Sequence, residues 1–170
     1  MKIVPAQEIK QLEIIERLAW EIIPEFYAPY VPLDHCIFFV EKFQTVTAIQ
    51  KQIVEGFEYY LLNYKENIAG YLGIHATNEI LLLSKLYLLK EFRGKGIGDK
   101  VMSFVYKRAH ELKSSTIELI VNRQNKGAID FYEKRGFTIV QPIVSKFENG
   151  HSTEEFKMEK NIDREVHSGS

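Results

Sequence analysis

The sequence predicts a mixed α/β fold in which a central sheet is flanked by helices. Two patterns favour this class. Segments of helical period alternate with apolar, β-branched and aromatic runs, and a succession of strand, glycine loop, helix and strand predicts a parallel crossover among strands that otherwise form hairpins. With 170 residues, 45% of them hydrophobic, the chain is long enough to bury one core without disulfides or metals. We therefore expect a single domain over residues 1–160, and a disordered tail over residues 161–170 that has little to bury.

The N-terminal part of the chain predicts a short strand followed by a helix. Residues 2–4 suit a strand, and apolar side chains then recur at helical spacing from Pro5 to about Ile23. Pro24 is expected to end this helix, because proline lacks a backbone N–H and clashes with the preceding turn. The prolines and aromatics of residues 24–32 predict irregular structure beyond it.

Residues 34–56 predict one or two further helices. Thr47 and Gln50 have the spacing of a capping box, and Gly56 suits a C-terminal stop. Cys36, the single cysteine, lies in an apolar run, so we expect a small buried residue rather than a nucleophile.

The rest of the chain predicts six strands and two helices. Three strands are expected over residues 57–64, 68–75 and 79–89, and the first two are separated by polar residues that suit a hairpin turn. Then follow a helix over 97–112, a strand over 116–121, a helix closed by Gly136, and strands over 137–147 and 153–160. The last two flank Asn149-Gly150, a strong hairpin signal.

A glycine loop joins the third of these strands to the helix that follows. It reads Arg93-Gly94-Lys95-Gly96-Ile97-Gly98. A strand that leads through such a loop into a helix presents unpaired N–H groups and the helix dipole to an anion. Glycine at alternate positions lets the main chain approach the anion, while Arg93 and Lys95 add positive charge. The loop therefore predicts a pyrophosphate site.

A second motif lies downstream, where the chain reads N-K-G-A-I-D-F-Y-E-K-R-G-F from Asn125 to Phe137. Together with Arg93, Gly96 and Gly98, this motif resembles the GCN5-related N-acetyltransferase (GNAT) family. That family binds acetyl-coenzyme A through a loop with an arginine or glutamine, then a glycine, then a glycine or alanine, at this spacing. The matching residues run from Leu86 to Phe137, whereas the N-terminal half agrees only in the order of its elements.

The resemblance implies a fold and a set of cofactor contacts. In the family the strand before the loop and the parallel strand after the helix splay apart, and pantetheine lies against the main chain of the first. Here that main chain belongs to Leu86, Tyr87 and Leu88, and a main-chain N–H near Leu88 would stabilise the oxyanion. The loop, residues Arg93, Gly94, Lys95, Gly96, Ile97 and Gly98, would hold the pyrophosphate.

The resemblance also suggests catalytic residues in the second motif. Asn125 matches a cofactor-binding asparagine, although an N-cap of the following helix explains it equally well. Tyr132 matches the tyrosine that protonates the departing thiolate, and a phenol remains protonated at neutral pH. The alternative role for Tyr132 is that of a core aromatic.

A general base is harder to find in the sequence. One position at which the family carries a glutamate holds Ile120, and the strand before the loop has no carboxylate after Glu79. Glu118 lies on the same strand face as Ile120 and is the candidate base, with a cross-strand ion pair as the alternative. His75, at a strand end, is a further candidate only because histidine side chains in general can accept a proton near neutral pH.

These features predict an enzyme that transfers the acetyl group of acetyl-coenzyme A to a primary amine of a small molecule or peptide. A non-catalytic acetyl-coenzyme A sensor fits the same motifs if no base is present. A nucleotide-binding domain is less favoured: Glu118 stands near the spacing of a ribose-binding acid, but too few crossovers follow the loop for a doubly wound sheet. The sequence leaves both a monomer and a homodimer open.

Charge and composition exclude several other classes. A net charge of -1 gives no basic surface for nucleic acid, and no apolar run is long enough to cross a membrane. The sequence shows no metal site, and with one cysteine and no signal peptide we expect a cytoplasmic protein. Carboxylates after the first helix and in the C-terminal hairpin, including Glu25, Glu154 and Glu155, suggest as acceptor a polyamine or a peptide amine, with solvated surface acids as the alternative explanation.

Overall fold

The computed structural model describes residues 1–162. Of the tail predicted over residues 161–170, Asn161 belongs to the last strand, and residues 163–170 lie outside the described residues. The helices are α1 (Ile9–Tyr27), α2 (Leu33–Phe43), α3 (Val46–Val54), α4 (Ile97–Glu111) and α5 (Lys126–Glu133), with a 3-10 turn, η1 (Lys90–Phe92). The strands are β1 (Lys2–Pro5), β2 (Phe57–Tyr64), β3 (Asn67–Thr77), β4 (Ile80–Leu88), β5 (Thr116–Asn122), β6 (Thr138–Lys146) and β7 (Ser152–Asn161).

The predicted mixed α/β class is confirmed. The strands follow the order β1-β2-β3-β4-β5-β7-β6, and the pairs β1 with β2, β2 with β3, β5 with β7 and β6 with β7 are antiparallel. The pairing of β4 with β5 is parallel, as the crossover through α4 requires. The chain divides into two compact units, which we describe separately, and β4 and α4 contribute residues to both.

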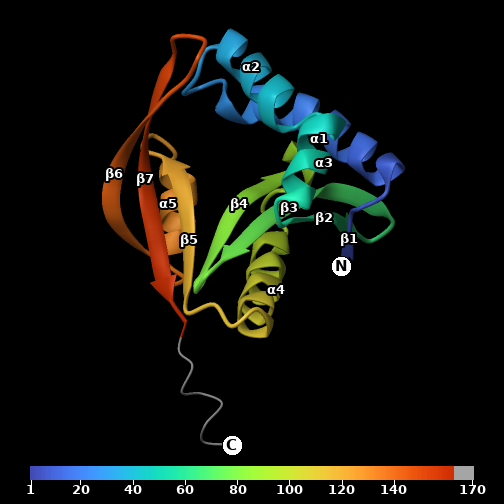
Figure 1. Cartoon of the computed structure of the whole chain (residues 1–170), viewed down its shortest axis with the longest axis vertical. Helices are drawn as coiled ribbons and strands as arrows, with labels where there is room; N and C mark the ends of the chain where they lie inside the picture. Colours follow the sequence, from blue (N-terminus) through green and yellow to red (C-terminus); the bar gives the residue numbers. More distant parts are fainter. Residues whose placement is uncertain (163–170) are drawn as a thin grey trace, which may run out of the picture. The chain divides into compact units, whose positions relative to one another are not determined.

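The N-terminal unit comprises residues 1–75 and 84–103. Helices α1, α2 and α3 lie together in this unit (Figure 1). Their apolar side chains form one core with aromatic residues of the strands: Leu12, Ile15, Ile22, Val40 and Ile49 from the helices, and Tyr59, Tyr71 and Tyr87 from β2, β3 and β4. This core positions the second half of β4, which leads into the glycine loop.

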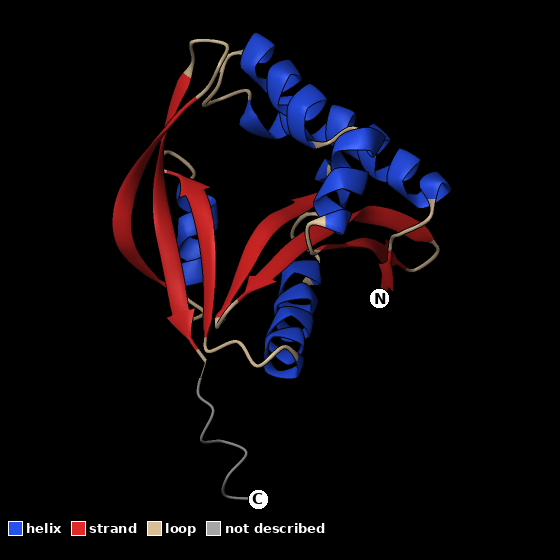
Figure 2. Cartoon of the chain, in the orientation of Figure 1, coloured by secondary structure: helices blue, strands red, loops and turns tan. Residues whose placement is uncertain are grey.

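The C-terminal unit comprises residues 76–83 and the chain from residue 104. Its three strands β5, β7 and β6 run side by side, with α5 beside them (Figure 2). Ile117, Leu119 and Val121 are buried at alternate positions of β5, while Glu118 and Ile120 occupy the other face. The predicted hairpin turn is present, with Gly150 at a φ of +86°.

Two boundary predictions for α1 are wrong. The helix begins at Ile9 rather than Pro5, because Pro5 belongs to β1, where it pairs with Tyr60 of β2. The side chain of Gln11 then accepts hydrogen bonds from the N–H groups of Gln7 (3.0 Å) and Glu8 (3.1 Å) at the start of the helix. The helix also continues through Pro24 to Tyr27. A proline this close to the end interrupts only one turn, and the packing of Phe26 and Tyr27 against the core offsets that loss.

The capping prediction for the next helices is also wrong. Two helices form between residues 33 and 54, and the cap of α3 is Thr45 rather than Thr47. The Thr45 hydroxyl accepts a hydrogen bond from the N–H of Ala48 at 3.2 Å. Gly56 follows this helix at a φ of +108°, which confirms it as the stop.

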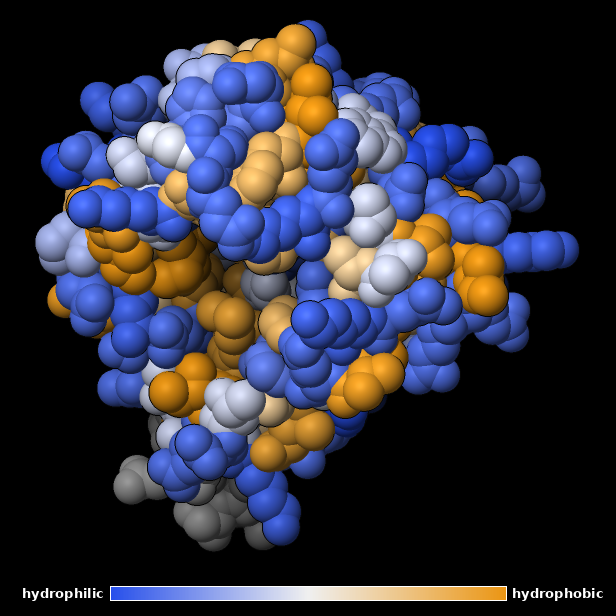
Figure 3. Space-filling view, turned by 45° about the horizontal axis from the view of Figure 1, so that its top comes forward, coloured by the Kyte–Doolittle hydropathy of each residue, from blue (hydrophilic) through white to orange (hydrophobic). Residues whose placement is uncertain are grey.

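Apolar side chains reach the surface in separate groups among hydrophilic ones on the face drawn in Figure 3. The exposed large hydrophobic residues of the described chain come from different elements and include Ile9, Leu33, Val54 and Val144. Within residues 1–162, no helix combines the length and hydrophobicity that a membrane crossing requires.

Candidate active site

The strand before the glycine loop is fixed by close packing in the N-terminal unit. Tyr87 is buried, and Leu86 and Leu88 on either side of it are half-buried. Gly70 of β3 lies so close to the carbonyl group of Tyr87 that a Cβ there would overlap it. The parallel pairing of β4 with β5 covers Ile80–Leu82 and Thr116–Glu118, so Leu86, Tyr87 and Leu88 lie outside it.

The Tyr87 side chain belongs to a buried group of tyrosines. Its hydroxyl lies 3.0 Å from that of Tyr27, and its ring lies 5.6 Å from the ring of Tyr71. Burial raises the pKa of Tyr87 well above its ordinary value, with the neighbouring tyrosines acting in the same direction. The phenol is therefore neutral at physiological pH, and it fixes β4 rather than supplying charge.

The glycine loop has the backbone of an anion site. Gly94 and Gly96 have φ values of +75° and +79°, a region that side chains other than glycine rarely adopt. A Cβ at either position would meet nothing within 4 Å, so these glycines are required by their backbone angles rather than by neighbouring atoms. In the described chain, no backbone hydrogen bond of the loop uses the N–H groups of Gly94, Lys95 or Gly96. Ile97 and Gly98 follow in the first turn of α4, where backbone N–H groups lack helical partners.

Arg93 is held by three contacts inside the N-terminal unit. Its Nε donates to the carbonyl oxygen of Leu88 at 3.1 Å, and its guanidinium group pairs with Glu25, the closest N–O distance being 2.9 Å. The guanidinium also lies 5.3 Å from the ring centre of Phe26. Glu25 therefore shares the charge that was expected to serve an anion. No local sequence pattern predicts this pair, because 68 residues separate Arg93 from Glu25.

The predicted residues of the second motif lie in the C-terminal unit. Asn125 is buried, and its Oδ1 accepts a hydrogen bond from the N–H of Ala128 at 3.1 Å, which confirms the N-cap of α5. The ring of Tyr132 is half-buried and contacts those of Phe131 (5.1 Å) and Phe137 (5.5 Å) edge to face. The cofactor contact of Asn125 and the acid role of Tyr132 stay predictions.

Glu118 makes the ion pair that was the alternative to its role as base. Its carboxylate lies 3.2 Å from Nζ of Lys157 on β7, and its side chain is 17% exposed. The family position held by Ile120 has no titratable group. His75 lies in the other unit, where its ring stacks on Phe57 at 4.1 Å and its Nε2 lies 3.3 Å from the carbonyl oxygen of Glu55.

Two of the acids expected near the acceptor, Glu154 and Glu155, have partners inside the C-terminal unit. Glu154 pairs with Arg123 at 3.2 Å, and Glu155 accepts hydrogen bonds from the hydroxyls of Ser145 (2.5 Å) and Thr153 (3.2 Å).

Cys36 is buried as expected. Its burial raises the pKa of its thiol, and the charge of Asp34 acts in the same direction. Among residues 1–162, no group of three or more His, Cys, Asp or Glu side chains is placed to hold a metal ion.

Comparison with known proteins gives one family. A family model described as an acetyltransferase (GNAT) domain matches residues 31–160. An uncharacterised N-acetyltransferase encoded in the pepI 3′ region of Lactobacillus delbrueckii subsp. lactis is 32% identical over 91 residues, which are 49% of this chain and 53% of that protein. The aligned part of the chain thus spans about half the length of this relative.

Two solved structures share the fold over nearly the whole chain. One is a PaiA N-acetyltransferase from Thermoplasma acidophilum in complex with coenzyme A, with a TM-score of 0.78 and 21% identity, covering 95% of this chain and 100% of that one. The other is the ribosomal-protein-S18-alanine N-acetyltransferase from Escherichia coli, with a TM-score of 0.71 and 14% identity, covering 95% and 94%.

Proposed function

Because the chain belongs to the GNAT acetyltransferase family, whose domain model matches residues 31–160, we propose that it transfers the acetyl group of acetyl-coenzyme A directly to a primary amine of a small molecule or peptide. The observation that carries this proposal is the backbone of the glycine loop. Two glycines at positive φ and N–H groups without backbone acceptors precede the first turn of α4, which is the arrangement that a pyrophosphate requires.

The residues present fit the cofactor in the N-terminal unit. The N–H groups of Gly94, Lys95 and Gly96 are donors for phosphate oxygens, and Lys95 is an exposed cation beside them. The main chain of Leu86, Tyr87 and Leu88 is the proposed contact for pantetheine, because these residues lie outside the pairing of β4 with β5. When bound, acetyl-coenzyme A supplies a thioester that an amine can attack.

We assign three residues of the C-terminal unit by their match to the family motifs. Asn125 is proposed to contact the cofactor while its side chain caps α5, and Tyr132 to protonate the leaving thiolate. Glu118 is the proposed base, and its carboxylate lies 3.2 Å from Nζ of Lys157. An amine that arrives from solution already neutral would need no base from the protein.

Thermal unfolding with and without ligands tests the binding part of this proposal. Acetyl-coenzyme A at 100 times its Kd should add about 2.7 kcal/mol of stability, whereas NAD and ATP should add none. Gly96→Asp should abolish the shift, because it strains the loop and places a negative charge against the phosphates.

The matched control for that variant is Gly150→Asp, which introduces the same side chain at a similar φ of +86° in the β6–β7 turn. It should leave the shift by acetyl-coenzyme A intact. Stabilisation by NAD alone, or loss of the shift in both variants, would count against a cofactor site at the glycine loop.

A non-catalytic acetyl-coenzyme A sensor is the second candidate. The ion pair of Glu118 favours it, because a carboxylate that already contacts Lys157 at 3.2 Å is less available to contact an incoming amine. The two candidates differ in turnover. A sensor gives the thermal shift but releases no coenzyme A thiol with any amine, whereas an enzyme releases it in step with the acetylated product.

A further inference from the structure

A pocket of about 400 Å³ opens in the N-terminal unit among residues that none of the predicted cofactor contacts uses. We call it the basic pocket. Lys42, Phe43, Lys51, Phe57, Ser84 and Lys85 are the lining residues that matter most here, and Ala48, Gln52 and Glu55 complete the lining. The first six come from α2, α3, β2 and β4. The volume is within the range of small-molecule sites.

Positive charge predominates in the basic pocket. Three of its lining residues are lysines and one, Glu55, is a carboxylate, so the lining has a formal net charge of +2. A concave surface with one predominant sign of charge concentrates ligands of the opposite sign. The charge therefore favours an anion.

Lys85 occupies an unusual place on its strand. Side chains two residues apart point to the same face of a strand, and Leu83 and Tyr87, on either side of Lys85 in that row, are buried. Lys85 itself is half-buried, with Nζ 2.8 Å from the hydroxyl oxygen of Ser84 and 5.7 Å from the ring centre of Phe39. Nζ also lies 3.3 Å from the carbonyl oxygen of Ser84, and a bound anion would add a charged acceptor beside these neutral ones.

The helix dipole accounts for the positions of Lys42 and Lys51 but not for that of Lys85. Lys42 and Lys51 lie in the last turns of α2 and α3, where a cation interacts favourably with the helix dipole. This reason does not apply to Lys85, which is on a strand. The convergence of all three on one pocket is what requires a further explanation.

The walls of the basic pocket are apolar and firmly held. Phe57 is stacked on His75 at 4.1 Å and 11°, and the ring of Phe43 lies 5.6 Å from Nζ of Lys42. The amide of Gln52, which also lines the pocket, accepts from the Tyr59 hydroxyl (2.5 Å) and donates to the Phe43 carbonyl (2.8 Å). Two aromatic faces beside clustered ammonium groups suit a ligand with an apolar body and an anionic end.

We propose that the basic pocket binds a small organic anion, a carboxylate or phosphate group on an apolar body about the size of a benzene ring. The anionic group lies among Lys42, Lys51 and Lys85, and the body lies against Phe43 and Phe57. This site does not depend on acetyl transfer, and its ligand differs from the proposed cofactor. A carboxylate and a phosphate share the required chemistry, and the probes below distinguish them.

Isothermal titration with simple probes tests the ligand class. Phenyl phosphate and benzoate carry the anion on a ring, whereas benzyl alcohol and benzylamine carry a neutral or cationic group on the same ring. We expect at least one anionic probe to bind at least tenfold more tightly than the other two, and the affinity to fall as salt is added. The stronger of the two anionic probes identifies the preferred group.

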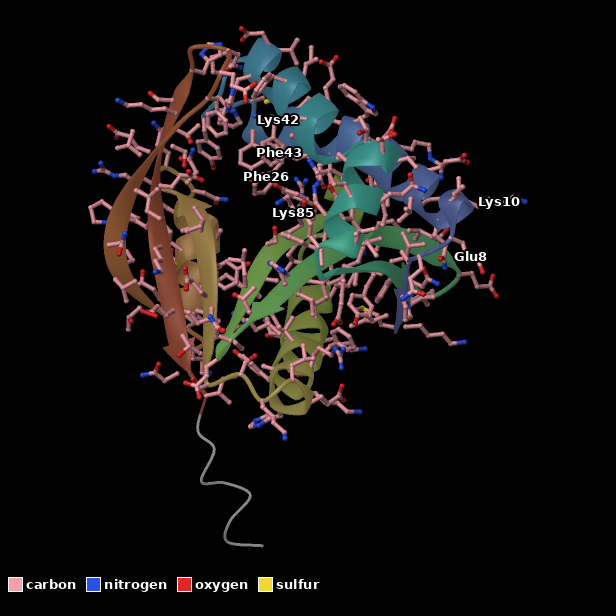
Figure 4. All side chains as sticks on the ribbon, in the orientation of Figure 1. Glu8, Lys10, Phe26, Lys42, Phe43 and Lys85 are labelled. Carbon is pink, nitrogen blue, oxygen red and sulfur yellow. The ribbon has the colours of Figure 1, made fainter. Side chains whose placement is uncertain are left out.

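Variants of lysines inside and outside the pocket locate the site, and Figure 4 labels two of these lysines, Lys85 and Lys10. Lys85→Met keeps the apolar stem and removes the charge, and it should weaken binding of the anionic probe about tenfold or more. Lys51→Met makes the same change at an exposed helix position that does not threaten the fold, and it should weaken binding in the same direction. Lys10→Met is the control, because Lys10 is an exposed lysine of α1 that does not line the pocket, and its effect should stay within twofold.

Gly96→Asp separates the basic pocket from the glycine loop. This variant should leave the affinity for the anionic probe unchanged even where it abolishes binding of acetyl-coenzyme A, so the two proposals can fail independently. The proposal is overturned if benzyl alcohol binds as well as the anions, if no anionic probe binds, or if Lys10→Met weakens binding as much as Lys85→Met. Loss of probe binding in Gly96→Asp would likewise overturn it and assign the probe to the loop.

Discussion

Tyr59 is a buried tyrosine whose hydroxyl lies between two glutamine side chains. It donates to Oε1 of Gln52 at 2.5 Å and accepts from Nε2 of Gln44 at 3.2 Å, while Oε1 of Gln44 accepts from the hydroxyl of Tyr71 at 2.5 Å. Burial raises the pKa of Tyr59 to about 12, although the hydrogen bond from Gln44 acts in the opposite direction. The phenol must therefore stay neutral for the N-terminal unit to remain packed.

This pKa shift predicts a loss of stability in alkali. The folded-state pKa lies above the unfolded value of about 10, so the contribution is fully present below pH 10 and is lost as the pH rises towards 12. Between pH 10 and pH 12, each unit of pH should lower the free energy of unfolding by up to about 1.4 kcal/mol through Tyr59 alone. Urea unfolding at several pH values should show a smaller alkaline decrease for Tyr59→Phe than for the wild type. Equal decreases would contradict the assignment to Tyr59.

Tyr132 provides the residue-scale test of catalysis. If it protonates the thiolate, Tyr132→Phe should lower kcat by roughly 10² to 10⁴ while the thermal shift by acetyl-coenzyme A stays as large as in the wild type. The ring contacts with Phe131 and Phe137 remain available to phenylalanine, so the fold should be retained. Tyr106→Phe, a change of the same kind on α4, should have no comparable effect on kcat. Wild-type turnover in Tyr132→Phe would return the residue to a packing role.

At the scale of elements, the approach of β3 to β4 depends on Gly70. A side chain there would overlap the carbonyl group of Tyr87, so Gly70→Ala must push the two strands apart. We expect a loss of more than about 3 kcal/mol in the free energy of unfolding, at the large end for single substitutions.

Gly127 gives the matched glycine-to-alanine control. It lies in the first turn of α5, and the nearest atom to an added Cβ would be Oδ1 of Asn125 at 3.9 Å. Alanine should therefore be tolerated there, or stabilise by up to about 1 kcal/mol, because it favours the helix. Urea denaturation midpoints of both variants decide the point. Equal effects at the two positions would show that the close packing of Gly70 is not what limits substitution.

The elements that sequence predicted well are those with local causes. The alternating strands, the Asn149-Gly150 turn and the crossover through α4 follow from periodicity and turn chemistry within a few residues. The end of α1 was missed, because the packing of Phe26 and Tyr27 against distant residues extends the helix beyond Pro24. The cap at Thr45 was missed because the neighbouring Thr47 has the spacing of a capping box.

At the scale of the molecule, the difference between local and distant causes separates the proposed cofactor site from the basic pocket. The glycine loop and the second motif are each a continuous stretch of the sequence, so sequence alone predicts their residues. The pair of Arg93 with Glu25 and the three lysines of the basic pocket join elements far apart in the chain. Such contacts have no local pattern, and only the packed N-terminal unit brings them together.

Direct measurement of acetyl transfer tests the central claim. The protein is mixed with acetyl-coenzyme A and a panel of primary amines, and the released thiol and the acetylated amine are quantified together by a thiol reagent and mass spectrometry. We predict equal amounts of both products with at least one amine, abolished by Gly96→Asp and retained by Gly150→Asp. Binding of acetyl-coenzyme A without either product across small-molecule and peptide amines would contradict an acetyltransferase and leave a sensor.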